Sequence, residues 1–223
     1  MSGRLILVRH GQTEANVARR LDTRLPGARL TAEGIAQAEA FATTLAAERD
    51  AAALVSSEAL RARQTADPAE RLAGLSLQVR PGLHETQVGH LEDRSDEESH
   101  HLFAKTYSEW HTGDLKARMP GGESGGDVLD RFLPVVADLR EEFLDDPELT
   151  GNVVVVSHGA AIRLVAAQLA RVPGDFALTH HLANTHTVEL DPIPGGGWRL
   201  VAWGAAATPI DVTDTPDTDD PMG

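Results

Sequence analysis

Two aliphatic runs that end in the same dipeptide constrain the fold more than any other feature of the sequence. Residues 5–11 read LILVRHG and residues 153–159 read VVVVSHG, so each run ends in a histidine followed by a glycine. Short uninterrupted aliphatic runs of this kind predict strands that are buried on both faces, as in parallel sheets. Because the carboxyl ends of neighbouring parallel strands meet at one edge, we expect His10 and His158 to face the same crevice.

The rest of the chain alternates between helical and extended patterns. Further strands are predicted at 53–56, 186–191 and 198–203, and helices at 31–49, 59–73, 126–144 and 159–170. Strands that alternate with helices favour a parallel sheet whose two faces are covered by helices. We therefore expect an α/β fold, a three-layer α/β/α sandwich with a mostly parallel central sheet.

The length and composition indicate one domain with two unusual segments. A chain of 223 residues fits a single folded domain, which we place at residues 1–204. Residues 86–125 are rich in Asp, Glu, His and Ser, and we expect an insertion there, packed over one sheet edge and over the crevice. Residues 205–223 contain five Asp and no Lys or Arg, so a disordered acidic tail is expected.

Charge and composition argue against several classes of partner. The net charge of -14 disfavours binding to nucleic acid or to anionic membranes. No apolar stretch approaches the roughly 20 residues that span a bilayer, and the start of the chain lacks a signal-peptide pattern. The absence of cysteine rules out thiolate metal sites and fits a reducing compartment. We therefore expect a cytoplasmic protein whose partner is a small molecule.

Arginines accompany the two histidines. Arg9 directly precedes His10, and a further predicted strand leads into Arg61 and Arg63. An arginine fork matches phosphate oxygens with two parallel hydrogen bonds, and a helix that begins after His158 would offer its first N–H groups to an anion. A nucleophilic imidazole beside fixed positive charge is what phosphoryl transfer through phosphohistidine requires.

Five motifs, in the right order, resemble those of the histidine phosphatase superfamily, also called the phosphoglycerate mutase-like family. Residues 9–16, RHGQTEAN, resemble its RHG-x-T-x-x-N signature. The other four matches are SSEALRARQT at 56–65, LHETQVGHLE at 83–92, PGGES at 120–124 and VSHG at 156–159. The resemblance spans roughly residues 4–203 and implies a three-layer α/β sandwich that needs no metal ion.

The resemblance implies catalytic roles for five residues. His10 would attack phosphorus and carry the phosphoryl group as phosphohistidine. Arg9, Arg61 and His158 would hold the phosphoryl oxygens. Glu85 would protonate the leaving oxygen as the general acid and then activate water as the general base.

A second set of residues is expected to bind or shape the phosphate site. The resemblance implies that Asn16 donates a further hydrogen bond to the phosphate and that Thr13 belongs to the same binding loop. Gly11 and Gly159 would shape the backbone around the phosphate, because glycine lets the chain turn sharply and approach a ligand closely.

Two of these roles have competitors nearby in the sequence. Arg63 lies two residues after Arg61, and we expect it on a solvated helix face. Glu92 and Asp93 compete with Glu85, and the Leu-x-Glu spacing favours Glu85. The family's W-E-G segment is replaced by Leu-Glu-Asp at this point, which puts the substrate in doubt rather than the chemistry.

Histidine doublets at 100–101 and 180–181 raise the alternative of a metal site. Adjacent residues on a helix point in different directions, and no H-E-x-x-H or similar spacing is present, so we expect no metal. The aromatic residues Phe103, Tyr107 and Trp110 recur at helical spacing, and we expect them to form a core stripe.

Three hypotheses about function remain open at this stage. The first is a phosphatase that hydrolyses small phosphomonoesters without a cofactor. The second is a cofactor-dependent phosphoglycerate mutase, which would use 2,3-bisphosphoglycerate, and the third is a catalytically silent phosphate-binding module. The sequence also leaves the oligomeric state open, with a homodimer as one alternative.

Overall fold

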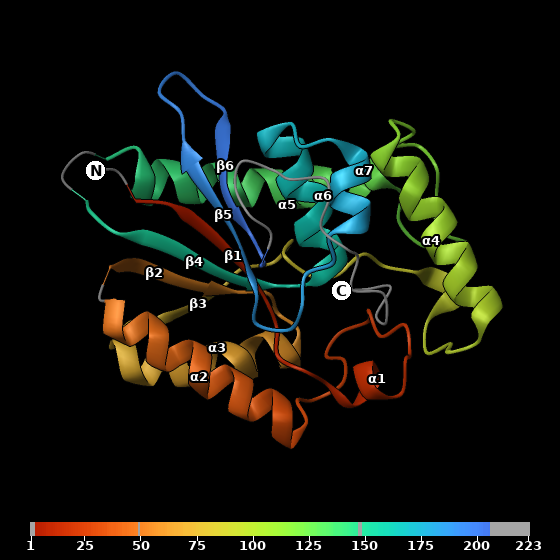
Figure 1. Cartoon of the computed structure of the whole chain (residues 1–223), viewed down its shortest axis with the longest axis horizontal. Coiled ribbons are helices and arrows are strands. Elements are labelled where there is room, and N and C mark those ends of the chain that lie inside the picture. The colour runs from red at the N-terminus through yellow and green to blue at the C-terminus, as the bar shows by residue number, and fades with distance from the viewer. Residues whose placement is uncertain (1–2, 49, 147–148, 206–223) are drawn as a thin grey trace.

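The computed structural model describes residues 3–48, 50–146 and 149–205. It contains a six-stranded sheet between two layers of helices (Figure 1). The strands are β1 Leu5–Arg9, β2 Ala51–Ser56, β3 Leu77–Val79, β4 Asn152–Ser157, β5 Thr187–Pro192 and β6 Trp198–Trp203. The helices are α1 Glu14–Val17, α2 Ala32–Glu48, α3 Leu60–Ala73, α4 Glu97–His111, α5 Gly125–Leu139, α6 Gly159–Ala170 and α7 Gly174–Thr179. Short helical turns also occupy Gly89–Leu91 and Arg140–Leu144.

The sheet order is β3-β2-β4-β1-β5-β6, and its first four strands are parallel to one another. The last two strands, β5 and β6, join as an antiparallel edge. Helices α2 and α3 cover one face of the sheet, and α5 and α6 cover the other (Figure 1). The predicted three-layer α/β/α sandwich with a mostly parallel sheet is therefore confirmed.

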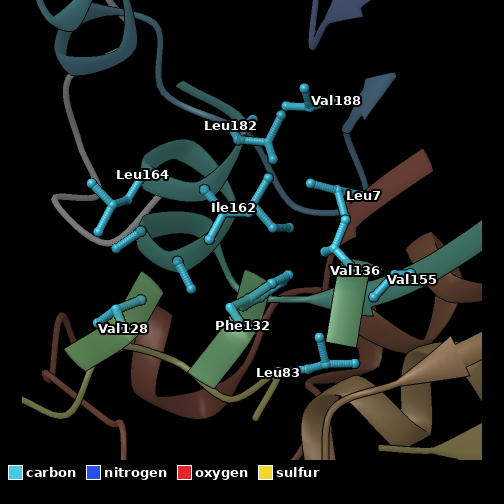
Figure 2. Packing of buried hydrophobic residues seen from close by; sticks show 14 of the residues in the cluster. Leu7, Leu83, Val128, Phe132, Val136, Val155, Ile162, Leu164, Leu182 and Val188 are labelled. Atoms are coloured by element: carbon cyan, nitrogen blue, oxygen red, sulfur yellow. The ribbon is translucent and has the colours of Figure 1, made fainter. Parts of the chain in front are cut away.

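Side chains of the central strands alternate between two cores, one on each face of the sheet. In β1, Leu5 and Leu7 belong to the core under α5 and α6, whereas Ile6 and Val8 belong to the core under α2 and α3. Figure 2 shows Phe132 of α5 among the side chains packed in the first of these cores. Burial on both faces explains why the central strands read as unbroken aliphatic runs.

Several elements differ from the sequence expectations. The helix predicted at 126–144 ends at Leu139, and the chain continues as a single wider π-helical turn. Strand β3 has three residues, too few to give an alternation pattern. Helix α4 was not predicted, because its sequence is polar except for one narrow stripe.

The stripe itself was predicted correctly. Phe103, Tyr107 and Trp110 are buried in the core on the α5 and α6 side of the sheet, and the Tyr107 hydroxyl donates to the Ala160 carbonyl at 2.8 Å. This bond ties α4 to the first turn of α6. The expected acidic tail falls almost wholly on residues 206–223, which lie outside the described residues.

Among the helices of the described ranges, none combines the length and apolarity needed to cross a membrane.

Two glycines let the loop after β1 pack directly on the backbone of α2. A Cβ atom on Gly34 would overlap the carbonyl oxygen of Gln12, and one on Gly11 would lie 2.6 Å from the carbonyl oxygen of Gly34. The Gly11 N–H also donates to the Thr65 hydroxyl of α3 at 2.9 Å. The loop that carries His10 is thus held by backbone contacts that only glycine permits.

We predict opposite effects for alanine at two glycines that both lie in the first turn of a helix. Gly34→Ala should lower the free energy of unfolding by roughly 1–3 kcal/mol, because the methyl group overlaps backbone. Gly126→Ala in α5 should be neutral or raise it by up to about 1 kcal/mol, because a Cβ there meets its nearest atom at 3.5 Å. Urea unfolding of both variants measures the difference, and equal effects would contradict the packing described.

Candidate active site

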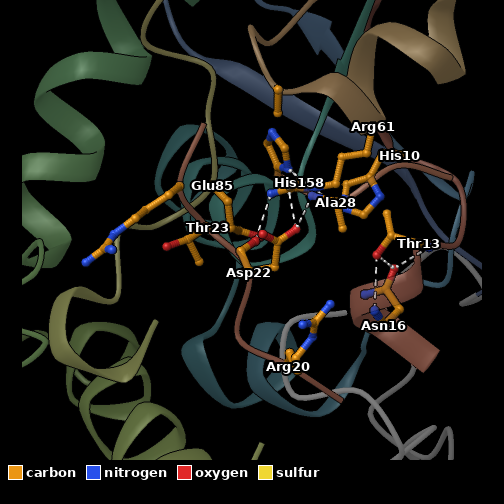
Figure 3. Close-up of polar contacts among 12 residues, drawn as sticks. His10, Thr13, Asn16, Arg20, Asp22, Thr23, Ala28, Arg61, Glu85 and His158 are labelled. Atoms are coloured by element: carbon orange, nitrogen blue, oxygen red, sulfur yellow. Dashed lines mark hydrogen bonds and ion pairs between the residues drawn. The ribbon is translucent and has the colours of Figure 1, made fainter. Parts of the chain in front are cut away.

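Five buried side chains meet beyond the carboxyl ends of β1, β2 and β4. His10 follows β1, His158 follows β4, and Arg61 lies in the first turn of α3 after β2 (Figure 3). Arg9 ends β1, and Glu85 comes from the irregular segment after β3. Each of the five is at most 5% exposed, although all five are polar or charged. Such a buried polar cluster is costly unless its members satisfy one another.

The parallel pairing of β1 with β4 brings the two histidines together, as the sequence predicted, but only His10 lines the pocket, and His158 is fully buried. Arg9 is opposite Ser157 in the register, so the residues that follow them leave the sheet side by side. The two imidazole rings meet edge to face with centroids 5.2 Å apart. Arg61 lies between them, since its Nε donates to Nε2 of His10 at 3.1 Å and to Nδ1 of His158 at 3.2 Å.

The hydrogen bonds of His10 define its tautomer. Nδ1 lies 2.8 Å from the carbonyl oxygen of Gly11, which can only accept, so Nδ1 carries the proton. In the neutral ring Nε2 then has the lone pair, which agrees with its acceptance of the Arg61 N–H. Nε2 is therefore the nitrogen of His10 that has the lone pair.

His158 has the opposite tautomer. Its Nδ1 accepts from Arg61, so its Nε2 carries the proton and donates to the Ser57 hydroxyl at 2.8 Å. Ser57 also accepts the Ala59 N–H at 3.1 Å, which fixes the start of α3. His158 is fully buried and lies behind Arg61, so in this arrangement it orients the guanidinium.

Both histidines are held in the neutral form. Burial lowers the pKa of His10 well below its ordinary value, and the charges of Arg61 and Arg9 lower it further. Burial, the charge of Arg61 and the neighbouring His10 do the same to the pKa of His158. A neutral imidazole keeps its lone pair available, which a nucleophile needs.

The carboxyl group of Glu85 lies at the first turn of α6, a position that the sequence analysis did not anticipate. Its Oε1 accepts the N–H groups of Thr86 at 2.7 Å and Ala161 at 2.9 Å, and its Oε2 accepts that of Ala160 at 3.2 Å. The first N–H groups of α6, which the sequence analysis expected to face a bound phosphate, donate to the Glu85 carboxyl group instead. Burial raises the pKa of the Glu85 carboxyl, opposed by these N–H groups and by Arg61.

The loop after His10 is built around a capping box. Asn16 Oδ1 accepts from the N–H and the hydroxyl of Thr13, both at 3.0 Å, while the Asn16 N–H donates to the Thr13 hydroxyl at 3.1 Å. This reciprocal arrangement begins α1 and fixes the carboxamide oxygen on Thr13. The amide nitrogen of Asn16 is therefore the end turned away from Thr13, and Asn16 lines the pocket.

Backbone contacts with residues 182–185 hold Arg9 and His10 in place. The Arg9 guanidinium donates to the carbonyl of Leu182 at 2.8 Å, and the Asn184 side chain donates to the carbonyl of His10 at 2.8 Å. The Thr185 N–H donates to the Arg9 carbonyl at 2.9 Å. These residues lie behind the site and fix the backbone on which its side chains are mounted.

Asp22 is a site residue to which sequence reasoning gave no role. Its carboxylate pairs with Arg61 NH1 at 3.3 Å, and its backbone carbonyl accepts from Arg61 NH2 at 3.1 Å. Asp22, Arg20 and Ala15 line the pocket together with His10, Arg61 and Glu85. The pocket volume is about 20 Å³, close to the room that one water molecule needs, and the pocket is partly open to solvent.

The competitors of the expected residues have other partners. Glu92 accepts the N–H groups of Thr23 and Arg24, both at 3.0 Å, so it holds the loop that carries Asp22. Arg63 is exposed, as predicted. This structural role of Glu92 could not be predicted from sequence, because 69 residues separate Glu92 from Thr23 and the path of the loop is needed to bring them together.

Within the ranges that the structure describes, no group of three or more His, Asp or Glu residues is placed to hold a metal ion. One histidine of each doublet has a different partner. His100 bonds through Nε2 to the Arg19 carbonyl at 2.8 Å, and His180 stacks on Phe176 with ring centroids 3.8 Å apart.

The geometry thus combines a nucleophilic nitrogen, buried positive charge and a carboxyl group with a raised pKa. Comparison with known proteins shows which family combines such groups. The family model of the histidine phosphatase superfamily, branch 1, matches residues 5–206, and the chain belongs to that superfamily. It falls in the phosphatase branch, and phosphoryl hydrolysis is the reaction class.

Three relatives illustrate the similarity. Glucosyl-3-phosphoglycerate phosphatase of Mycolicibacterium vanbaalenii is 32% identical over 217 residues, which cover 92% of this chain and 95% of that protein. The PE-PGRS family protein PE_PGRS11 of Mycobacterium tuberculosis is 35% identical over 206 residues, 88% of this chain but only 35% of that protein's length. A solved structure of a mycobacterial glucosyl-3-phosphoglycerate phosphatase in complex with VO3 superposes with a TM-score of 0.77 at 30% identity, covering 92% of this chain and 100% of that one.

The lowered pKa of His10 predicts a pH dependence of stability. Below the ordinary value of 6.5 the unfolded chain gains a proton at this residue and the folded chain does not, so acid favours unfolding. The stability that His10 contributes relative to His10→Asn should therefore fall by up to about 1.4 kcal/mol per pH unit below 6.5. Urea unfolding of both proteins between pH 7.5 and about 5 measures this. A difference that stayed constant would contradict a neutral buried His10.

Proposed function

We propose that this protein hydrolyses small phosphomonoesters through a phosphoryl group carried on Nε2 of His10. One observation carries the proposal. The Gly11 carbonyl fixes the proton of His10 on Nδ1, so the lone pair of the neutral ring is at Nε2, beside the buried guanidinium of Arg61. A neutral imidazole next to fixed positive charge is suited to attack an anionic phosphoryl group.

In the first step, Nε2 of His10 forms a bond to phosphorus and the bond from phosphorus to the ester oxygen breaks. Glu85 gives its proton to that oxygen, and an alcohol leaves. The raised pKa of the Glu85 carboxyl supports this role, because more of the acid is protonated near neutral pH. Arg61 releases Nε2 of His10 and turns its N–H groups to the phosphoryl oxygens as the new bond forms.

In the second step, a water molecule attacks phosphorus and the bond to Nε2 of His10 breaks. The Glu85 carboxylate takes a proton from that water, and inorganic phosphate leaves with the electron pair returned to Nε2. We assign three side chains to bind the phosphoryl oxygens: Arg9, Arg61 and Asn16. Gly11, Thr13 and Gly159 shape the backbone around the phosphate. His158 reaches those oxygens only after Arg61 has turned, because Arg61 separates it from the pocket.

Two kinds of observation support a small phosphorylated metabolite as the substrate. Two of the three relatives named above are glucosyl-3-phosphoglycerate phosphatases, and the solved structure of one is a complex with VO3, an oxoanion like phosphate. The pocket is narrow, and Arg20 and Asp22 line it beside His10. We propose that neither a metal ion nor an organic cofactor takes part.

We also propose that residues 86–125 belong to the same domain and cover the site. The segment just before α4 exchanges two backbone hydrogen bonds with the pocket loop. The Leu21 N–H donates to the Arg94 carbonyl at 2.9 Å, and the Asp93 N–H donates to the Leu21 carbonyl at 2.8 Å. The loop that carries Asp22 is therefore fixed by this segment.

We predict that His10→Asn abolishes hydrolysis of p-nitrophenyl phosphate, with a loss of roughly a thousandfold or more, because the covalent route is removed. Wild-type protein mixed with ³²P-labelled substrate and quenched should carry an acid-labile label that His10→Asn lacks. Arg63→Ala is the matched control, since this exposed arginine lies two residues from Arg61 and should leave both readouts unchanged. Absence of hydrolysis across a panel of esters would favour the silent phosphate-binding module.

The alternative hypothesis, a phosphoglycerate mutase, predicts a different product from 3-phosphoglycerate. With 3-phosphoglycerate we expect release of inorganic phosphate and little 2-phosphoglycerate, with or without 2,3-bisphosphoglycerate. The rate should not change on addition of a chelator. Isomerisation that outpaces phosphate release would establish the mutase, and inhibition by chelator would overturn the metal-free chemistry.

A further inference from the structure

Arg131 of α5 makes five hydrogen bonds next to the proposed general acid, although it lies outside the pocket. Its NH1 donates to the carbonyls of Gly82 and His84, both at 2.7 Å, and its NH2 donates to the carbonyl of Glu85 at 3.1 Å. The same guanidinium donates to Glu123 through Nε at 2.7 Å and through NH2 at 2.9 Å. One side chain therefore fixes three carbonyls at and just before Glu85.

Glu123 forms hydrogen bonds to the backbone that follows Glu85. Its carboxylate accepts the Gln87 N–H at 2.8 Å, and its own N–H donates to the Gln87 carbonyl at 2.8 Å. Arg131 and Glu123 thus form hydrogen bonds to the backbone on both sides of Glu85. Both side chains are largely buried, at 15% and 17% exposure, so solvent competes weakly for these bonds.

The segment around Glu85 depends on such contacts because it belongs to no helix or strand. Irregular backbone has no ladder of hydrogen bonds to hold it, so its carbonyls need side-chain partners. The position of the Glu85 carboxyl group beneath α6 then follows from where this backbone lies. A shift of about 1 Å in a catalytic group can cost a hundredfold in rate.

We infer that Arg131 and Glu123 are positioning residues, whose paired side chains fix the backbone of Glu85 so that its carboxyl group can deliver a proton to the leaving oxygen. The inference rests on the proposed role of Glu85 as general acid. A lysine cannot replace Arg131, because one ammonium group cannot reach three carbonyls and a carboxylate with a planar fork.

Leaving-group dependence separates positioning from mere stability. An alkyl ester such as glycerol 3-phosphate needs a proton on its departing oxygen, whereas p-nitrophenolate departs without one. kcat/KM covers only the steps up to the phosphoenzyme, so it reports this proton transfer and not the later attack by water. We expect Arg131→Ala, Arg131→Lys and Glu123→Gln to lower kcat/KM for the alkyl ester by about a hundredfold and for the aryl ester by less than about threefold.

Arg140 provides a matched control on the same helical run. It donates to the carbonyls of Gly197 at 2.7 Å and Ile193 at 2.9 Å and pairs with Asp145, but it holds the β5–β6 turn. Arg140→Ala should cost comparable stability and keep the ratio of the two kcat/KM values at the wild-type level. Chemical unfolding of each variant measures the stability side.

The outcomes are distinguishable. If Glu85→Gln shows the selective loss and the Arg131 and Glu123 variants lose both substrates equally, or neither, the positioning role is wrong. If Glu85→Gln itself shows no selectivity, the proposed function of Glu85 fails first. Should Arg131→Ala not fold, Arg131→Lys and Glu123→Gln decide the question on the same two substrates.

Discussion

The parallel pairing of β1 with β4 is the interaction on which the site depends. Both strands are buried on both faces, so their pairing lies at the centre of the sheet between the two cores. With Arg9 opposite Ser157, the chain leaves the two strands at the same level and the two imidazoles meet. The strand register thus brings together groups that are 148 residues apart in sequence, and Arg61 donates a hydrogen bond to each of them.

The elements of the site that could be predicted from sequence are those tied to strand ends. His10, His158 and Arg61 each follow an aliphatic run, and topology then brings their side chains to one edge. Glu85 could be named only by resemblance, because its segment has no periodicity. The contacts of Asp22 and Arg131 could not be predicted, since each joins segments about 40 or more residues apart through irregular loops.

The same distinction applies to the fold. The long aliphatic strands and amphipathic helices were found, since their periodicity is a local property. Strand β3 and helix α4 were missed because neighbours stabilise them: β3 adds to the edge of β2, and α4 packs on α7 and contacts α6 through Tyr107. The first N–H groups of α6 were expected to face a bound phosphate, and sequence alone could not show that they donate to Glu85, which is 75 residues away from Ala160 along the chain.

The pairing of Asp22 with Arg61 has a consequence for product release. A buried guanidinium without an anion would be costly, and Asp22 supplies that anion in the free protein. In the proposed mechanism, binding of a phosphate group at Arg61 would therefore be an exchange of one anion for another, and its affinity would reflect the difference between the two. In the proposed mechanism, inorganic phosphate would then gain correspondingly little by staying, so the carboxylate of Asp22 would limit product inhibition.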